Sequence, residues 1–179
     1  LRNDDHFEIQ FKEIFDHMAA LYGLDDMQKD QLMQWEIEGE LEAVIPLVPQ
    51  ISLLKKYIAE GNDIVLISDM YLPKEVIVKL LQKADPLLAT LPLYVSSEVG
   101  HQKTTRKLFL HVYSDLDYCY EKWIHIGDNR FADQVQPEML GIQTAPIPVP
   151  EWTPYEKRLA DYSSHYEFCC VAKQIQSFR

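Results

Sequence analysis

The fold class is decided by the stretch Ile64-Val65-Leu66-Ile67-Ser68-Asp69, in which an unbroken aliphatic run ends in a hydroxyl and a carboxylate. Such a run is typical of a strand that is covered on both faces of a sheet. In open parallel sheets, ligands bind beyond the carboxyl ends of the strands. The polar residues that directly follow this run are therefore candidate site residues.

Further apolar runs of this kind follow toward the C-terminus. Three further apolar runs predict strands at Leu93–Val95, Trp123–Ile126 and Ile142–Ile147. Helical spacing of apolar residues separates the runs, and it predicts helices over 50–60, after Pro73, over 103–116 and over 131–140, the last interrupted at Pro137. Strands that alternate with helices predict β-α-β units, and thus an α/β fold with a mostly parallel sheet covered by helices on both faces.

The N-terminal part has a different pattern. Apolar residues at a spacing of three to four predict an amphipathic helix over 7–22 that ends at Gly23, and a second helix over 26–43. Alternation within Ile37-Glu38-Gly39-Glu40-Leu41 leaves a strand open as an alternative there. We therefore predict a helical segment at 1–48, an α/β core at 49–150 and a C-terminal helical extension at 151–179.

Charge and cysteine content narrow the partners and the compartment. The 179 residues carry a formal net charge of −11, and residues 1–45 alone hold 12 acidic and 3 basic residues. A chain this acidic is expected to be repelled by nucleic acid and by anionic membrane surfaces. No stretch reaches the roughly 20 apolar residues that span a bilayer. The 3 cysteines include the adjacent pair Cys169 and Cys170, which cannot easily form a disulfide, so a reducing cytoplasm is expected.

Polar side chains follow three of the predicted strands. Ser68 and Asp69 follow the first, Ser96-Ser97 the second, and Gly127-Asp128-Asn129 the third, with Asp133 one turn further on and Lys103 at the start of a helix. Hydroxyls and backbone N–H groups can hold a phosphate, a lysine adds a positive charge, and carboxylates are ligands for Mg²⁺. These residues are expected to converge on one edge of the sheet.

Plainer roles remain open for each of these residues. Ser68 could cap the following helix, Lys103 could be a surface lysine, and Asp128 and Asp133 could serve a turn and a helix start. His125 lies inside a strand, where a hydrogen-bonded buried histidine is favoured over a metal ligand. Met70 and Tyr71 could line a pocket or simply pack.

Three motifs resemble those of the haloacid dehalogenase-like (HAD) hydrolase superfamily. Residues 64–73 resemble its motif II, Lys103 within 100–109 resembles the motif III lysine, and residues 125–133 resemble motif IV, of the form G-D-x-x-x-D. Their order and spacing fit over about residues 44–147. The Ser-Asp-Met-Tyr-Leu and His-Ile-Gly-Asp-Asn stretches are similar to a bacterial subgroup found beside glycosyltransferases or sugar-processing enzymes.

The resemblance implies a Rossmann-like three-layer parallel sheet with a helical cap, and a Mg²⁺-dependent phosphatase that acts on a small phosphorylated metabolite such as a sugar phosphate. Members form an aspartyl-phosphate that water then cleaves. Carried over by position, Ser68 and Asp69 bind the phosphoryl group, Lys103 neutralises the nucleophile and the phosphate, and Asp128 binds Mg²⁺. Asp133 belongs to the metal shell or orients it.

One motif is missing from the sequence. The resemblance implies a motif I strand that ends in Asp-x-Asp and carries the nucleophile, whereas the only look-alike, residues 13–18, follows a helical period. We therefore expect the nucleophile to lie upstream, in a longer protein of which this chain is a part. The alternative is a catalytically silent HAD-like module that binds a partner through its acidic N-terminal segment.

Overall fold

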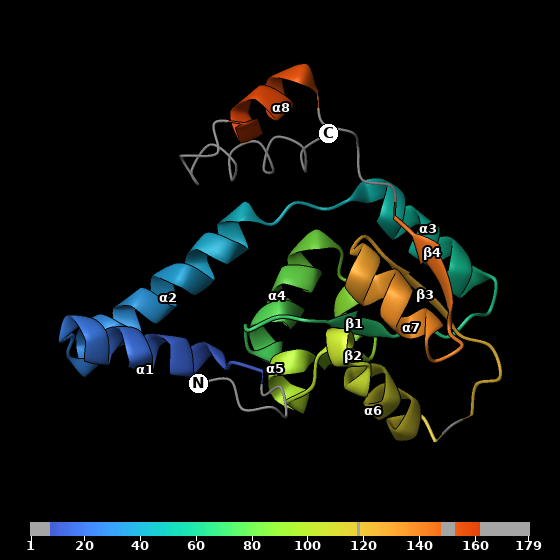
Figure 1. Ribbon diagram of the computed structural model, residues 1–179, viewed down its shortest axis with the longest axis horizontal. Coiled ribbons are helices and arrows are strands. Elements are labelled where there is room, and N and C mark those ends of the chain that lie inside the picture. Colours follow the sequence, from blue (N-terminus) through green and yellow to red (C-terminus); the bar gives the residue numbers. More distant parts are fainter. Residues whose placement is uncertain (1–7, 118, 148–152, 162–179) are drawn as a thin grey trace. The chain divides into compact units, whose positions relative to one another are not determined.

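The structure is a computed structural model, and it describes residues 8–117, 119–147 and 153–161 (Figure 1). The chain forms two compact units, the first ending at Glu121 and the second beginning at Lys122. Ser68 and Lys103 therefore belong to unit 1, and Asp128 and Asp133 to unit 2.

Unit 1 begins with three helices, α1 (Phe11–Tyr22), α2 (Asp26–Ala43) and α3 (Val48–Ala59). Helix α1 ends where predicted, because Gly23 adopts the left-handed conformation at φ 67°. Helix α2 begins after Asp25, whose carboxylate accepts a hydrogen bond from the Gln28 backbone N–H at 2.8 Å. The helical prediction for 26–43 is confirmed, and the strand alternative is wrong.

The remainder of unit 1 alternates strands and helices. Strand β1 (Leu66–Ser68) and strand β2 (Leu93–Val95) pair in parallel, with Leu66 opposite Leu93 and Ser68 opposite Val95. The crossover between them contains α4 (Lys74–Ala84) and a 3₁₀ turn, η1 (Leu88–Thr90). After β2 come α5 (Ser96–Val99), a second 3₁₀ turn, η2 (Lys103–Thr105), and α6 (Lys107–Asp115). This is the β-α-β connection that the sequence predicts.

The helix predicted over 103–116 is interrupted. Arg106 has a left-handed backbone, with φ 67°, so the 3₁₀ turn that contains Lys103 cannot continue into α6. Lys103 therefore lies in a short turn that precedes the helix instead of in its first turn.

Unit 2 contains a second parallel pair. Strand β3 (Ile124–Gly127) pairs with β4 (Gln143–Pro146), and a π-helix, η3 (Arg130–Val135), and α7 (Gln136–Glu138) connect them. The helix type changes next to Pro137, where the sequence predicts an interruption. A final helix, α8 (Pro154–Asp161), begins the predicted C-terminal extension, whose residues 162–179 lie outside the described part of the chain.

The α/β class is confirmed, but the single predicted sheet is not present in the described residues. The strands form two separate two-stranded parallel sheets, β1-β2 and β3-β4. Each predicted strand forms within one or two residues of its expected place. The described residues do not show one sheet that joins the two pairs, and β-branched runs identify strands without identifying their neighbours.

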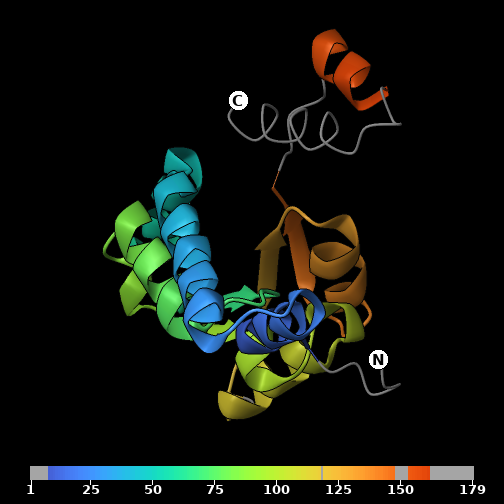
Figure 2. The ribbon, with the colours of Figure 1, turned by 90° about the vertical axis from the view of Figure 1, so that its left-hand side faces the viewer.

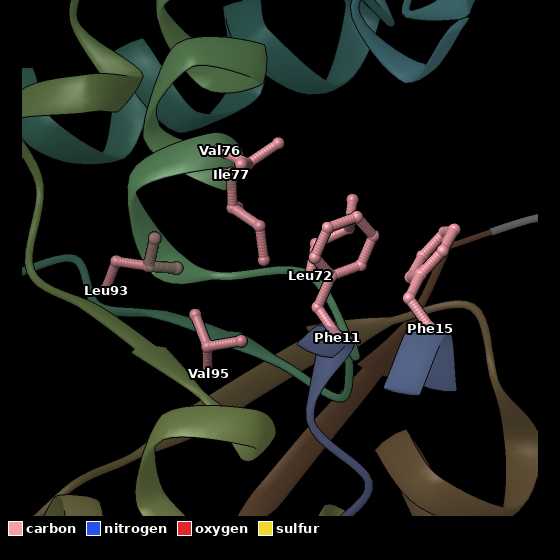
Figure 3. Close-up of a cluster of buried hydrophobic side chains, with 7 residues drawn as sticks. All are labelled: Phe11, Phe15, Leu72, Val76, Ile77, Leu93 and Val95. Atoms are coloured by element: carbon pink, nitrogen blue, oxygen red, sulfur yellow. The ribbon is translucent and has the colours of Figure 1, made fainter. Parts of the chain in front are cut away.

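The core of unit 1 joins the N-terminal helices to the first parallel pair. Figure 2 shows α1, α2 and α4 side by side, and contacts link α1 to α2 and α2 to α4. Seven apolar side chains are buried together between α1, α4, β2 and the loop after β1, namely Phe11, Phe15, Leu72, Val76, Ile77, Leu93 and Val95 (Figure 3). Residues 13–18 lie within α1, which confirms their helical interpretation. None of the helices in the described residues is long and apolar enough to cross a membrane.

Candidate functional site

The loop after β1 is held by the segment that carries Lys103. The backbone N–H of Lys103 donates to both carboxylate oxygens of Asp69, at 2.9 Å and 3.1 Å. Ser68 is the last residue of β1, so the hydroxyl lies beside the anchored carboxylate in the chain. Unit 1 therefore brings together the Ser68-Asp69 segment and the Lys103 segment, as the motif spacing predicts.

The alternative role of Ser68, as the cap of the following helix, is not supported. Helix α4 has Pro73 at its N-cap position and has no capping side chain, so Ser68 does not cap it. Asp69 acquires a positional role that sequence reasoning missed, because its carboxylate fixes the loop by binding a backbone donor. No spacing rule marks such a contact, since a backbone N–H is present at nearly every residue.

The two serines after β2 support the same loop. The Ser96 hydroxyl oxygen accepts a hydrogen bond from the Met70 backbone N–H at 2.9 Å. The Ser97 hydroxyl donates to the Leu72 carbonyl oxygen at 3.1 Å. Both serines are buried. They were expected among the groups that meet a ligand, and the structure instead uses them to tie the residues after β1 to the end of β2.

In unit 2, the carboxylate of Asp133 is buried and fully engaged. Its Oδ1 lies 3.0 Å from Nε2 of His125, and its Oδ2 accepts from the Asn129 backbone N–H at 3.0 Å. Asp133 and His125 are 3% and 8% exposed, respectively. The interpretation of His125 as a buried, hydrogen-bonded histidine is thereby confirmed.

The glycine of the G-D-x-x-x-D stretch is required by this carboxylate. A Cβ on Gly127 would lie 2.4 Å from the Cγ and the Oδ2 of Asp133, closer than real Cβ contacts come. The Asp133 side chain therefore occupies the space that any other residue at position 127 would need. This explains the spacing of the motif by packing, independently of any ligand.

Asn129 shapes the turn between β3 and the following helix. Its side-chain oxygen accepts hydrogen bonds from the backbone N–H groups of Phe131 and Ala132, both at 3.0 Å. Asn129 thus caps the helix that carries Asp133. Asp128, between Gly127 and Asn129, is exposed.

These residues fit Mg²⁺ in part. The ion keeps several waters and needs only one or two protein carboxylates besides phosphate oxygens, so an exposed Asp128 at the end of β3 suits it. Asp133 already accepts two hydrogen bonds, which favours the orienting role over direct ligation. Among the residues that the structure describes, no cluster of three His, Cys, Asp or Glu side chains could hold a metal ion. Further oxygen ligands would have to come from elsewhere.

Tyr71 both packs and lines a cavity. Its ring stacks on Phe11 with the centroids 6.2 Å apart, and its hydroxyl donates to Oε1 of Glu36 on α2 at 2.7 Å. Burial, followed by the hydrogen bond to Glu36, raises the pKa of Tyr71 well above its usual value. The sequence gives no sign of the Glu36 contact, because Glu36 is one of several acidic residues on α2.

Comparisons with known proteins add no family assignment. None of the protein-family models that were searched matches the chain, and no curated protein matches it significantly.

Proposed function

We propose that the chain is the body of a HAD-like hydrolase, a Mg²⁺-dependent phosphatase that acts on a small phosphorylated metabolite through an aspartyl-phosphate. The nucleophilic aspartate of this proposal lies outside the 179 residues. Ser68 binds the phosphoryl group, Lys103 neutralises its charge, and Asp128 binds the metal ion, which lowers the negative charge on the phosphate during attack.

The observation that carries the proposal is the double hydrogen bond from the Lys103 backbone N–H to Asp69. It connects two motifs that are 34 residues apart in sequence, at the carboxyl end of a parallel strand. Ligands of parallel α/β sheets bind at that end. A hydroxyl and a lysine from neighbouring loops there are suited to an anionic phosphate.

Unit 2 offers a second, independent support. The residues around Asp128 are held by two contacts of Asp133 and two of Asn129, so the turn that carries the exposed carboxylate is fixed. A metal ligand benefits from such support, because neighbouring hydrogen bonds keep it in position before the ion arrives.

The finer fold assignment belongs to this proposal as well. A three-layer sheet requires a central strand, and a sheet that lacks its central strand is left as two separate pairs. Two parallel pairs, β1-β2 and β3-β4, are therefore compatible with a motif I strand supplied by residues outside the chain. A cytoplasmic location remains a prediction from the cysteines, of which the structure describes only Cys119, exposed and free.

The test measures the rate at which the protein, purified from its natural source, hydrolyses phosphomonoesters with and without Mg²⁺. We expect Asp128→Asn to lower kcat for a small phosphomonoester by about a hundredfold or more, since it removes a charged metal ligand. Asp30→Asn is the matched control, because Asp30 is an exposed aspartate on α2. Activity that needs no Mg²⁺, or that survives Asp128→Asn, would refute the proposal and favour the silent binding module.

A further inference from the structure

Unit 1 contains a cavity of about 410 Å³ between α1, α2 and the loop after β1. Three aromatic side chains line it, Phe15 from α1, Trp35 from α2 and Tyr71 from the loop, together with aliphatic and thioether groups of the two helices. Glu36 is the only charged residue in the lining. Its lining is mostly apolar with a single carboxylate, as in many small-molecule sites, but the cavity is open to solvent, and Trp35 in its lining is 58% exposed.

The Glu36 carboxylate can accept further hydrogen bonds. An ionised carboxylate offers about four acceptor positions, and the Tyr71 hydroxyl uses one of them on Glu36. No second partner of Glu36 is found within the described residues. Glu40 lies one turn after Glu36 on α2 and is half-buried. The cavity therefore has one carboxylate in its lining and a second one a helical turn away.

This chemistry disfavours a sugar ring as the occupant. A sugar carries several hydroxyl groups, and each one that loses water without gaining a protein partner weakens binding. One carboxylate and one phenol cannot satisfy them all. A neutral apolar group would fit the walls but would leave the charge of Glu36 without a partner.

An organic ammonium group satisfies both features. Its charge is attracted by the faces of aromatic rings and by a carboxylate, while its alkyl groups pack against apolar walls. We propose that this cavity binds an organic ammonium cation. We further propose that the substrate is a zwitterionic phosphomonoester whose ammonium end lies in the cavity. This second step rests on the proposed phosphatase function.

The cavity is close in the chain to the residue proposed to bind phosphate. Tyr71 is three residues beyond Ser68, so their Cα atoms are at most about 11 Å apart. The proposal therefore names aminoalkyl phosphates with a short linker, such as phosphocholine, as the substrate class.

The cavity is tested first by binding alone, without turnover. Choline is titrated into the protein, with its neutral isostere 3,3-dimethylbutanol and with glucose as comparisons at equal ionic strength, and binding is followed by calorimetry. We expect choline to bind saturably and at least about fivefold more tightly than the isostere. Equal affinity for choline and the isostere, tighter binding of glucose, or no saturable binding would overturn the proposal.

Two variants on α2 separate the effect of the Glu36 carboxylate on choline binding from the effect of the protein's net charge. We expect Glu36→Gln to weaken choline binding about tenfold, and Glu38→Gln, which removes the same charge from an exposed residue outside the cavity, to change it less than twofold. Trp35→Leu adds a test at a residue that is 58% exposed, so this substitution should not disturb the core. It should weaken choline binding severalfold, and equal effects of the two glutamate variants would refute the assignment.

Turnover then distinguishes the two proposals. If choline binds as expected but neither phosphocholine nor any sugar phosphate tested is hydrolysed with Mg²⁺, the cavity stands and the phosphatase proposal fails. If phosphomonoesters are hydrolysed without preference for phosphocholine over sugar phosphates, the phosphatase stands and the zwitterionic substrate is refuted.

Discussion

Replacement of Gly127 by alanine gives the sharpest prediction for unit 2. The new Cβ would lie 2.4 Å from Oδ2 of Asp133 and 2.5 Å from its Cβ, so the whole side chain must move, not only its flexible end. That movement breaks the hydrogen bond that Asp133 accepts from the Asn129 N–H and the one it shares with Nε2 of His125, both 3.0 Å long.

The expected loss follows from those two bonds. A hydrogen bond to a charged group contributes about 1.5–3 kcal/mol, and part of it is recovered if water reaches the displaced carboxylate. We therefore expect Gly127→Ala to lower the free energy of unfolding by about 3 kcal/mol. For a chain of this size the melting temperature would fall by roughly 6–12 °C.

Gly39→Ala is the matched control, with the opposite sign. Gly39 lies inside α2 and nothing lies within 4 Å of a Cβ built on it, so alanine should stabilise the helix by about 0.5–1 kcal/mol. Both variants are compared with the wild type by urea unfolding, followed by circular dichroism. A Gly127→Ala variant as stable as the wild type would show that the packing argument is mistaken.

A double-mutant cycle identifies the cause of the loss. Asp133→Gly alone removes the carboxylate and also the Cβ that would lie 2.5 Å from a Cβ at position 127, so it leaves room there. The double variant should therefore be about as stable as Asp133→Gly, so that the two effects are far from additive. Additive losses would mean that Gly127→Ala acts through the backbone and not through Asp133.

Two further predictions concern unit 1. Asp25→Ala should lower the free energy of unfolding by about 1 kcal/mol, because it removes the cap of α2, whereas Asp30→Ala within the same helix should not destabilise; urea unfolding measures both. Nζ of Lys55 lies 2.5 Å from Oδ2 of Asp85. This contact, followed by a hydrogen bond from the Leu87 backbone N–H, lowers the pKa of Asp85 below its usual 3.8. The contribution of the ionised Asp85 carboxylate to the free energy of unfolding is complete above about pH 5. It is lost as the pH falls through 3.8 toward the lowered pKa of the folded protein. Unfolding measured between pH 6 and 2.5 should therefore depend less steeply on pH in Lys55→Met, and an unchanged slope would contradict the pairing.

The elements of the fold could be predicted because their signals are local. The aliphatic run before Ser68 and the spacing of apolar residues over 26–43 are local patterns, so sequence reasoning located β1 and α2 closely. The interruption at Arg106 could not be predicted, since a left-handed arginine is rare and no glycine marks the position.

The candidate site was predictable in its residues but not in their partners. Strand ends identified Ser68 and Asp128 as candidates, because parallel sheets present ligands there. The contacts of Asp69 with the Lys103 N–H and of Tyr71 with Glu36 join residues more than 30 positions apart. Such pairs depend on tertiary packing, and a single sequence contains no local pattern for them.

The bond between Asp69 and the Lys103 backbone also affects how this chain can evolve. A backbone N–H is the same whatever side chain the residue carries, so replacing Lys103 by another non-proline residue leaves the loop anchored. One substitution could thus remove the positive charge while the fold persists. Under the proposed function, such a variant would lose the charge assigned to the phosphate and keep this anchor of the loop.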